Sequence, residues 1–238
     1  YICVSRPRRF GKSMAANMLA AYYDRSENTE ELFRNLAISK DSSYKENLNQ
    51  YDVIKINMQE FLSMSGTMEE MLDMLKKYLV LDFEEAYPQV RFRDEKNLIQ
   101  VLKDVFSYTR CPFVILIDEW DCLFREYKQD REAQKKYLDF LRAWLKDKDY
   151  IAMAYMTGIL PIKKMKTQSA LNNFDEFTML DAGALASYIG FTELEVEKLC
   201  DKYHKDFAEV KRWYDGYVLE IKLLCLIINK RKINLSMT

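Results

Sequence analysis

The sequence predicts an α/β fold in which a mainly parallel β-sheet is flanked by helices. Short apolar runs that predict strands alternate with longer segments of helical periodicity over most of the 238 residues. One loop ends in Gly-Lys-Ser directly before a helical segment, and one apolar run ends in two carboxylates. Ligands of open parallel sheets bind at the edge formed by the carboxyl ends of the strands, where both features are expected to lie.

The predicted strands are short runs rich in apolar and β-branched residues. They cover residues 1–4, 52–58, 113–117 and 150–156. The run 113–117 is apolar throughout and lies between Pro112 and an acidic cluster, which is typical of a strand buried on both faces. Because helical segments separate the successive runs, the strands are expected to pair in parallel.

Apolar periodicity and capping patterns predict the helices. Residues 67–70 (Thr-Met-Glu-Glu) have the sequence of a capping box and open a helix that continues toward Ala86, and residues 192–195 open another. The other predicted helices cover residues 12–24, 94–108, 130–146 and 206–213. From about residue 181 onward the pattern is helical, so this part is expected to begin an appendage to the sheet.

The composition fits a helix-rich globular protein. Apolar residues make up 49% of the chain and charged residues 31%, with only 6 Gly and 4 Pro. The net charge of −1 argues against a general electrostatic attraction to nucleic acid or anionic lipid. The 5 cysteines form no C-x-x-C pair, which argues against zinc and favours a reducing cytoplasm. No apolar run is long enough to span a bilayer.

The loop from Arg6 to Ser13 has most of the pattern G-x-x-x-x-G-K-[ST], the Walker A loop. In such a loop, backbone N–H groups, the dipole of the following helix and a lysine converge on phosphate oxygens, and the hydroxyl binds Mg²⁺. Two positions depart from the pattern, because Arg6 replaces the first glycine and Pro7 lacks an amide donor. Arg8 and Arg9 could neutralise phosphate where amides are missing, or lie on the surface as arginine pairs usually do.

The second candidate element is the strand exit at Asp118 and Glu119, a Walker B arrangement. In a nucleotide hydrolase, an Asp at this place holds Mg²⁺ and an adjacent Glu deprotonates the attacking water. A buried strand with an acidic exit into solvent would look the same, but the combination with the Gly-Lys-Ser loop favours nucleotide binding. We therefore expect Asp118 on the metal side and Glu119 as general base. Asp121 could support the metal shell or the base, or act as a helix N-cap, which is the commoner role.

Six segments of the sequence together resemble one family. They are RPRRFGKS (6–13), VILIDEWD (114–121), MTGILPIKK (156–164), SALNNFDEFTML (169–180), GFTELEV (190–196) and KRWYDGY (211–217). As a set they resemble the bacterial AAA-ATPase-like proteins, P-loop ATPases whose longer members commonly carry a PD-(D/E)xK nuclease-like domain on the C-terminal side. The resemblance covers about residues 1–217, and in this family the first glycine of the loop is ordinarily replaced, as it is by Arg6.

The resemblance implies a P-loop NTPase fold, with ATP and Mg²⁺ as ligands, and it assigns roles to particular residues. Lys12 would contact the β- and γ-phosphates, Ser13 would bind Mg²⁺, and Thr157 would sense the γ-phosphate. Thr157 could instead end a strand and cap the turn at Gly158. The predicted site residues are Glu119, Lys12 and Thr157 for catalysis, Arg8, Arg9, Phe10, Gly11, Lys12, Ser13 and Met14 for the nucleotide, and Ser13 and Asp118 for the metal.

Two domains are expected. Residues 1–180 would form the AAA-ATPase-like domain, truncated at its N-terminal end because Tyr1 already lies in a strand. Residues 181–238 would begin an incomplete helical lid, with an atypical or truncated tail after Tyr217, where the family pattern stops. From this lid Arg212 could reach the nucleotide.

The predicted function is Mg²⁺-ATP binding with hydrolysis of the β–γ phosphoanhydride. A nucleotide-gated binding module with negligible turnover is the alternative. Nuclease activity is a third and less favoured interpretation, from the E-x-K triplet at Glu220 and Lys222 with Asp206 or Asp215 as the other acid. The expected partner is ATP, with no membrane, and both nucleic acid bound through a missing C-terminal domain and assembly into a homo-oligomer are left open.

Overall fold

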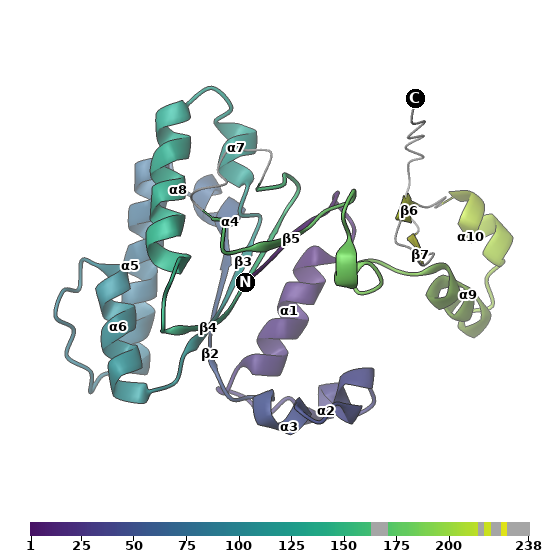
Figure 1. Ribbon diagram of the computed structural model, residues 1–238, viewed down its shortest axis with the longest axis horizontal. Helices are drawn as coiled ribbons and strands as arrows, with labels where there is room; N and C mark the ends of the chain where they lie inside the picture. Colours follow the sequence, from purple (N-terminus) through teal and green to yellow (C-terminus); the bar gives the residue numbers. More distant parts are fainter. Residues whose placement is uncertain (163–170, 214–216, 220–224, 228–238) are drawn as a thin grey trace.

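The computed structural model describes residues 1–162, 171–213, 217–219 and 225–227. Within these ranges a five-stranded sheet, parallel throughout, has the order β2-β3-β4-β1-β5 (Figure 1). The strands are β1 (Ile2–Ser5), β2 (Asp52–Asn57), β3 (Phe113–Asp118), β4 (Ile151–Gly158) and β5 (Asp175–Phe177). The predicted α/β class is confirmed, and β5 is a short edge strand that the sequence did not predict.

Helices fill the connections, as the apolar periodicity predicts. The longer ones are α1 (Lys12–Tyr23), α5 (Met68–Ala86), α6 (Leu98–Thr109) and α8 (Arg131–Leu145). Short ones are α2 (Glu30–Phe33), the 3₁₀ turn η1 (Ala37–Lys40), α3 (Tyr44–Asn47), α4 (Met58–Ser63) and α7 (Cys122–Glu126). The capping box predicted for α5 is confirmed by reciprocal hydrogen bonds between Thr67 and Glu70. The short helices are not predicted because one turn shows too little periodicity.

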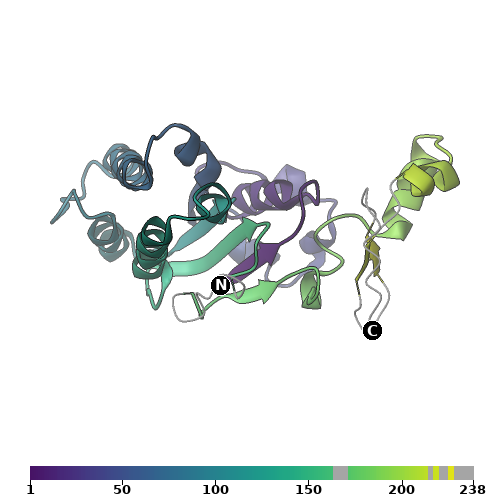
Figure 2. The same cartoon turned by 90° about the horizontal axis from the view of Figure 1, so that it is seen from above.

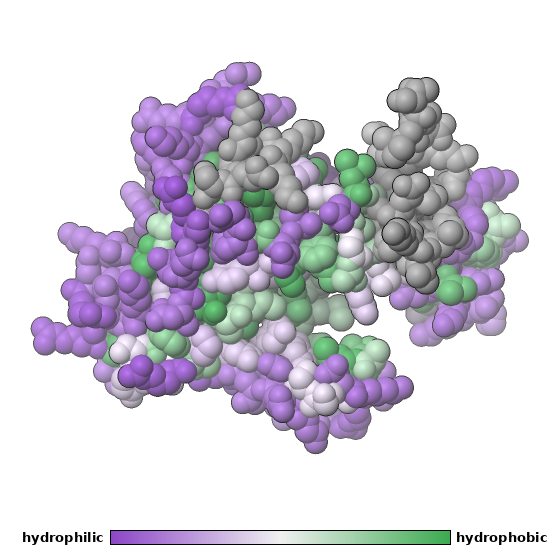
Figure 3. Space-filling model, in the orientation of Figure 1, coloured by the Kyte–Doolittle hydropathy of each residue, from purple (hydrophilic) through white to green (hydrophobic). Residues whose placement is uncertain are grey.

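Both faces of the sheet are covered, which explains why β3 is buried at every position. Phe113, Ile115 and Ile117 point into the larger core, which is formed with α4 to α8. Val114 and Leu116 point to the opposite face, into a smaller core with α1. Figure 1 accordingly shows α5, α6 and α8 on one side of the sheet and α1 on the other. The solvent side of the α5, α6 and α8 layer is mostly hydrophilic (Figure 3).

The register of the sheet brings the polar strand ends together. β4 lies between β1 and β3, with Ser5 of β1 opposite Gly158 of β4. Asp118 ends β3, and Thr157 precedes the last residue of β4, so these two polar residues belong to neighbouring strand ends. The loop that begins after Ser5 leaves from the same edge. The sheet therefore places this loop at the same edge as the acidic strand exit, with the end of β4 between them, as predicted.

The elements after the sheet form a separate group. The connection from β5 contains the 3₁₀ turn η3 (Gly183–Leu185) and leads to α9 (Glu193–Lys202), α10 (Phe207–Trp213) and an antiparallel pair, β6 (Tyr217–Leu219) and β7 (Cys225–Ile227). Figure 2 shows α9, α10 and the strand pair standing apart from the layers of the sheet, whereas η3 lies close to them. The capping box predicted for α9 is confirmed, whereas the strand pair is not predicted. In the described part of the chain, every helix falls short of the length and apolarity needed to cross a membrane.

Candidate functional site

The loop between β1 and α1 is bent by left-handed backbone at Arg9, with φ 73°, and at Gly11, with φ 81°. Gly11 stands at the N-cap position of α1, and its carbonyl accepts a hydrogen bond from Ala15 N at 2.9 Å. A Cβ at Gly11 would meet no atom within 4 Å, so the backbone angle rather than lack of space favours glycine. The loop leads directly into the first turn of α1, where unpaired N–H groups favour an anion.

Lys12 is one of two buried cations of this loop, and Arg6 is the other. Lys12 is 5% exposed, and its Nζ donates a hydrogen bond to the carbonyl of Pro7 at 2.9 Å. Burial lowers the pKa of Lys12, and nearby carboxylates oppose this shift, Glu119 most strongly and then Asp118. The loop of Lys12 leaves the sheet at the end of β1, and only β4 lies between that end and the end of β3, so the loop and Asp118 share one edge of the sheet. The structure thus brings together the two sequence features that were expected to share a site.

Asp118 ends β3, and its carboxylate is held by two hydrogen bonds. Its Oδ1 accepts from the hydroxyl of Thr157 and, at 3.0 Å, from the backbone N–H of Glu119. Thr157 is fully buried within β4, and this contact explains a polar side chain at that place. Both hydrogen bonds involve Oδ1, so Oδ2 of Asp118 receives none from the described residues.

Glu119 has a left-handed backbone conformation, with φ 55°, which is unusual for a residue with a Cβ. Its carboxylate forms an ion pair with Arg125 of α7. The same guanidinium lies 3.5 Å from Asp121 Oδ1 and donates to Gln59 Oε1 of α4 at 3.3 Å. Sequence reasoning missed Arg125, although its place four residues after Asp121, in a helical turn that follows the acidic cluster, was an available signal.

Asp121 connects the ends of two strands. It is fully buried and stands at the N-cap position of α7, but its side chain makes no capping hydrogen bond. Instead Oδ2 accepts from Ile159 N at 3.0 Å and from Leu160 N at 2.7 Å. The prediction that the Asp121 side chain caps a helix is therefore wrong, because its carboxylate accepts hydrogen bonds from the backbone amides that follow β4. Asp121 fixes the chain leaving β4 beside the chain leaving β3.

Gly158 lies where these two chain segments meet. A Cβ there would lie 2.7 Å from Trp120 Nε1 and 2.9 Å from Asp121 Oδ1, in two fully buried side chains. Gly158→Ala is therefore expected to lower the free energy of unfolding by about 1–3 kcal/mol, as overpacking usually does, measured by urea denaturation. Gly66→Ala is the control, because a Cβ there would meet the flexible end of Glu70 at 3.1 Å. Equal losses in both variants would contradict this packing argument.

The other predicted loop residues divide into exposed and buried ones. The exposed ones are Arg8, Arg9, Ser13 and Met14. Phe10 is buried in the smaller core, so its side chain anchors the loop and only its backbone is left to contact a ligand. The arginine pair is on the surface, as one of its two interpretations expected.

A metal ion at this site would have few protein ligands. The described residues contain no group of three or more His, Cys, Asp or Glu side chains placed to hold a metal. Mg²⁺ in nucleotide sites is usually bound through one or two protein oxygens, together with phosphates and water. Oδ2 of Asp118 and the exposed hydroxyl of Ser13 fit such a phosphate-dependent site.

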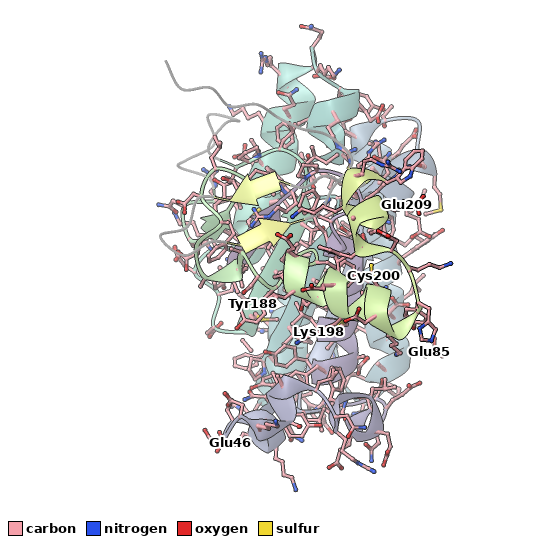
Figure 4. The ribbon with its side chains drawn as sticks, turned by 90° about the vertical axis from the view of Figure 1, so that its right-hand side faces the viewer. Glu46, Glu85, Tyr188, Lys198, Cys200 and Glu209 are labelled. Atoms are coloured by element: carbon pink, nitrogen blue, oxygen red, sulfur yellow. The ribbon has the colours of Figure 1, made fainter. Side chains whose placement is uncertain are left out.

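The remaining candidates lie on the C-terminal group or outside the described residues. Arg212 is exposed on α10. Asp206 accepts a hydrogen bond from the N–H of Glu209, labelled in Figure 4, at 2.8 Å and so serves the start of α10. The other residues of the nuclease interpretation lie outside the described ranges; they are Asp215, Glu220 and Lys222.

The parallel sheet, the loop before α1 and the acidic end of β3 together define a P-loop NTPase domain. The chain belongs to the Predicted AAA-ATPase family, whose sequence profile matches residues 1–167. This membership supports nucleotide binding by the P-loop domain.

Proteins similar to the chain include a bacterial relative and a solved archaeal structure. An Azotobacter chroococcum mcd 1 protein, described as an uncharacterized protein in the vnfD 5' region, is 24% identical over 225 residues, which are 90% of this chain and 41% of that protein. The chain thus spans less than half the length of this relative. The Aeropyrum pernix Orc1 protein, solved in complex with DNA, is similar over 85% of this chain and 50% of its own, with 14% identity and a TM-score of 0.36.

Proposed function

We propose that this domain binds Mg²⁺-ATP at the carboxyl edge of its sheet and hydrolyses the β–γ phosphoanhydride. The observation that carries the proposal is that the loop with the buried Lys12 and the acidic end of β3, at Asp118 and Glu119, lie at one edge of the sheet. Phosphoryl transfer requires a cation that binds the phosphates and carboxylates that hold the metal ion and orient the attacking water. Family membership supports the nucleotide-binding part.

Each residue of the group has a role in this proposal. The N–H groups at the start of α1 and the ammonium of Lys12 bind phosphate oxygens. Ser13 and Asp118 hold Mg²⁺, which supplies neutralisation of the phosphate charge when bound. Glu119 orients the attacking water and accepts its proton. Thr157 keeps Asp118 oriented through its hydroxyl, so it would sense the γ-phosphate through that carboxylate.

Two measurements on the wild-type chain test the proposal. Calorimetric titration with ATP, with and without Mg²⁺, measures binding, and a phosphate-release assay at saturating ATP measures hydrolysis. We expect binding that Mg²⁺ tightens, and phosphate release only when Mg²⁺ is present. A chain that binds no ATP would contradict the whole proposal, whereas tight binding without phosphate release would contradict hydrolysis alone.

A nucleotide-gated switch with negligible turnover is the second candidate, and the ion pair between Glu119 and Arg125 favours it. A carboxylate engaged by a guanidinium has to be released before it serves water as a base. If the pair persists when ATP is bound, the nucleotide shifts the conformational equilibrium of the domain without turnover.

Arg125→Gln is expected to raise the rate of phosphate release, because it removes the cation that engages Glu119. The measurement is phosphate release at saturating Mg²⁺-ATP. Arg142→Gln is the control, because the ion pair of Arg142 with Asp139, at 2.8 Å, lies on the exposed surface of α8. A lower rate in Arg125→Gln would show that Arg125 positions the base productively, which contradicts the restraining role.

A further inference from the structure

Arg6 occupies the first glycine position of the loop pattern and is one of the largest fully buried side chains of the protein. Its backbone N–H donates to the carbonyl of Gly158, at the end of β4, at 3.1 Å. Its Nη1 donates to the carbonyl of Phe177 at 3.0 Å and, at 3.4 Å, to that of Ser5. Because Phe177 ends β5, the side chain of Arg6 connects the loop to the edge strand beside β1.

The guanidinium of Arg6 has few of the hydrogen bonds and ion pairs that usually offset the cost of burying a charge. Its Nε and Nη2 make no hydrogen bond with the described residues, among which it also forms no ion pair with a carboxylate. Burial lowers the pKa of Arg6 to about 10, so the group stays protonated at neutral pH. A buried charge of this kind is often less stabilising than an apolar side chain of similar volume. The stability of the nucleotide-free protein therefore gives no reason for an arginine here.

The chain that follows β5 returns to the loop and α1. Phe177 lies against Gly183, where φ is +47° and a Cβ would come 3.0 Å from the phenyl ring. Further residues of this segment are buried in the smaller core, which also holds Phe10 of the loop; they are Ala182, Ala186 and Ile189. Residues 178–191 then lead to α9. Tyr188, labelled in Figure 4, is an exposed member of this segment.

We propose that Arg6 is a positioning residue that couples phosphate binding at the loop to residues 178–191 and, through them, to α9 and α10. The inference rests on the proposed function. The main chain of Arg6 belongs to the loop and its charged group is bonded to the end of β5, so a change in the loop alters that bond. Phosphate at the loop also brings negative charge toward this buried cation. Coupling between two sites is reciprocal. If bound phosphate orders residues 178–191, the ordered state of this segment therefore binds phosphate more tightly.

Hydrogen–deuterium exchange with and without saturating Mg²⁺-ATP tests the coupling in the wild type, Arg6→Met and Arg6→Lys. In the wild type, ATP is expected to slow exchange both in the loop and in residues 178–191. In Arg6→Met the loop stays protected by ATP, the protection of 178–191 is lost, and the dissociation constant rises about 5- to 150-fold, the range typical of coupled sites. Arg6→Lys keeps part of the protection, because an ammonium can still donate to the carbonyl of Phe177.

Thermal unfolding without nucleotide separates coupling from a structural role. Arg6→Met is expected to unfold at the same temperature as the wild type or a higher one, because an apolar side chain replaces a poorly compensated charge. Arg25→Met is the matched control for exchange and unfolding. Arg25 pairs with Asp52 at 2.8 Å at the amino end of β2, so its loss should leave the ATP response of 178–191 unchanged.

Four outcomes would overturn the coupling. The coupling fails if ATP still protects residues 178–191 in Arg6→Met. It also fails if the wild type binds ATP without protecting this segment. Both results leave the proposed function intact. Strong destabilisation of Arg6→Met, together with wild-type protection in Arg6→Lys at unchanged ATP affinity, would identify a purely structural residue. A wild type that binds no ATP would contradict the proposed function and the coupling together.

Discussion

Replacing Lys12 with alanine is expected to weaken ATP binding by roughly 100-fold. The ammonium is buried at the loop, so its contacts with phosphate would form away from bulk water. A hydrogen bond to a charged group contributes about 1.5–3 kcal/mol, and each 1.4 kcal/mol changes the dissociation constant about tenfold. Calorimetric titration of the variant with Mg²⁺-ATP measures the loss, and phosphate release should fall with it.

The control has to separate lost contact with phosphate from a damaged loop. Lys12→Ala also removes the donor to the carbonyl of Pro7, so thermal unfolding of the variant should be recorded. Lys12→Met keeps most of the side-chain volume and should show the same loss of binding. Lys55→Ala changes an exposed lysine of β2 and should bind ATP normally. Unchanged ATP affinity in Lys12→Ala would refute the assignment of the site.

Glu119→Gln is expected to reduce the rate of phosphate release by about 10²- to 10⁴-fold, the usual contribution of a general base. The amide keeps the size of the carboxylate but accepts no proton from water. ATP affinity should change little, because Lys12 and the loop remain. Single-turnover phosphate release and calorimetric titration of the same preparation measure the two effects separately.

Glu126→Gln is the matched control for this variant. Glu126 is exposed at the end of α7, so the substitution makes the same chemical change away from the candidate site. We expect wild-type phosphate release from it. If Glu119→Gln retained the wild-type rate, another group would have to act as the base, and the carboxylate of Asp118 would be the next to replace.

Local sequence determines several parts of this fold closely enough to predict them. The apolar run 113–117 forms β3, with Asp118 as its last residue. The two capping boxes form as expected, because the residues that make each box are three positions apart and need no distant partner. The predicted site also begins with local patterns, the Gly-Lys-Ser loop and the acidic strand exit. Parallel pairing then brings these patterns to one edge.

Contacts between distant residues could not be predicted in this way. The carboxylate of Asp121 is bonded to amides that follow β4, and the guanidinium of Arg6 to a carbonyl of β5. Neither hydrogen bond is associated with a periodic pattern of residues in the sequence. β5 itself has three residues, too few to show alternation. The ion pair between Arg125 and Glu119 depends on a one-turn helix and on left-handed backbone at Glu119. Neither feature can be predicted from the identity of these residues.

The position of β1 between β4 and β5 has a consequence for synthesis on the ribosome. Ile2 lies opposite Tyr155 on one side and Asp175 on the other, so β1 is translated long before the two strands that pair with it. The nucleotide loop that follows β1 therefore emerges early but has no sheet to hold it until β4, and then β5, has been translated. ATP cannot assist the early stages of folding, and a nascent chain halted before β4 would present β1 as an unpaired strand open to aggregation or chaperone binding.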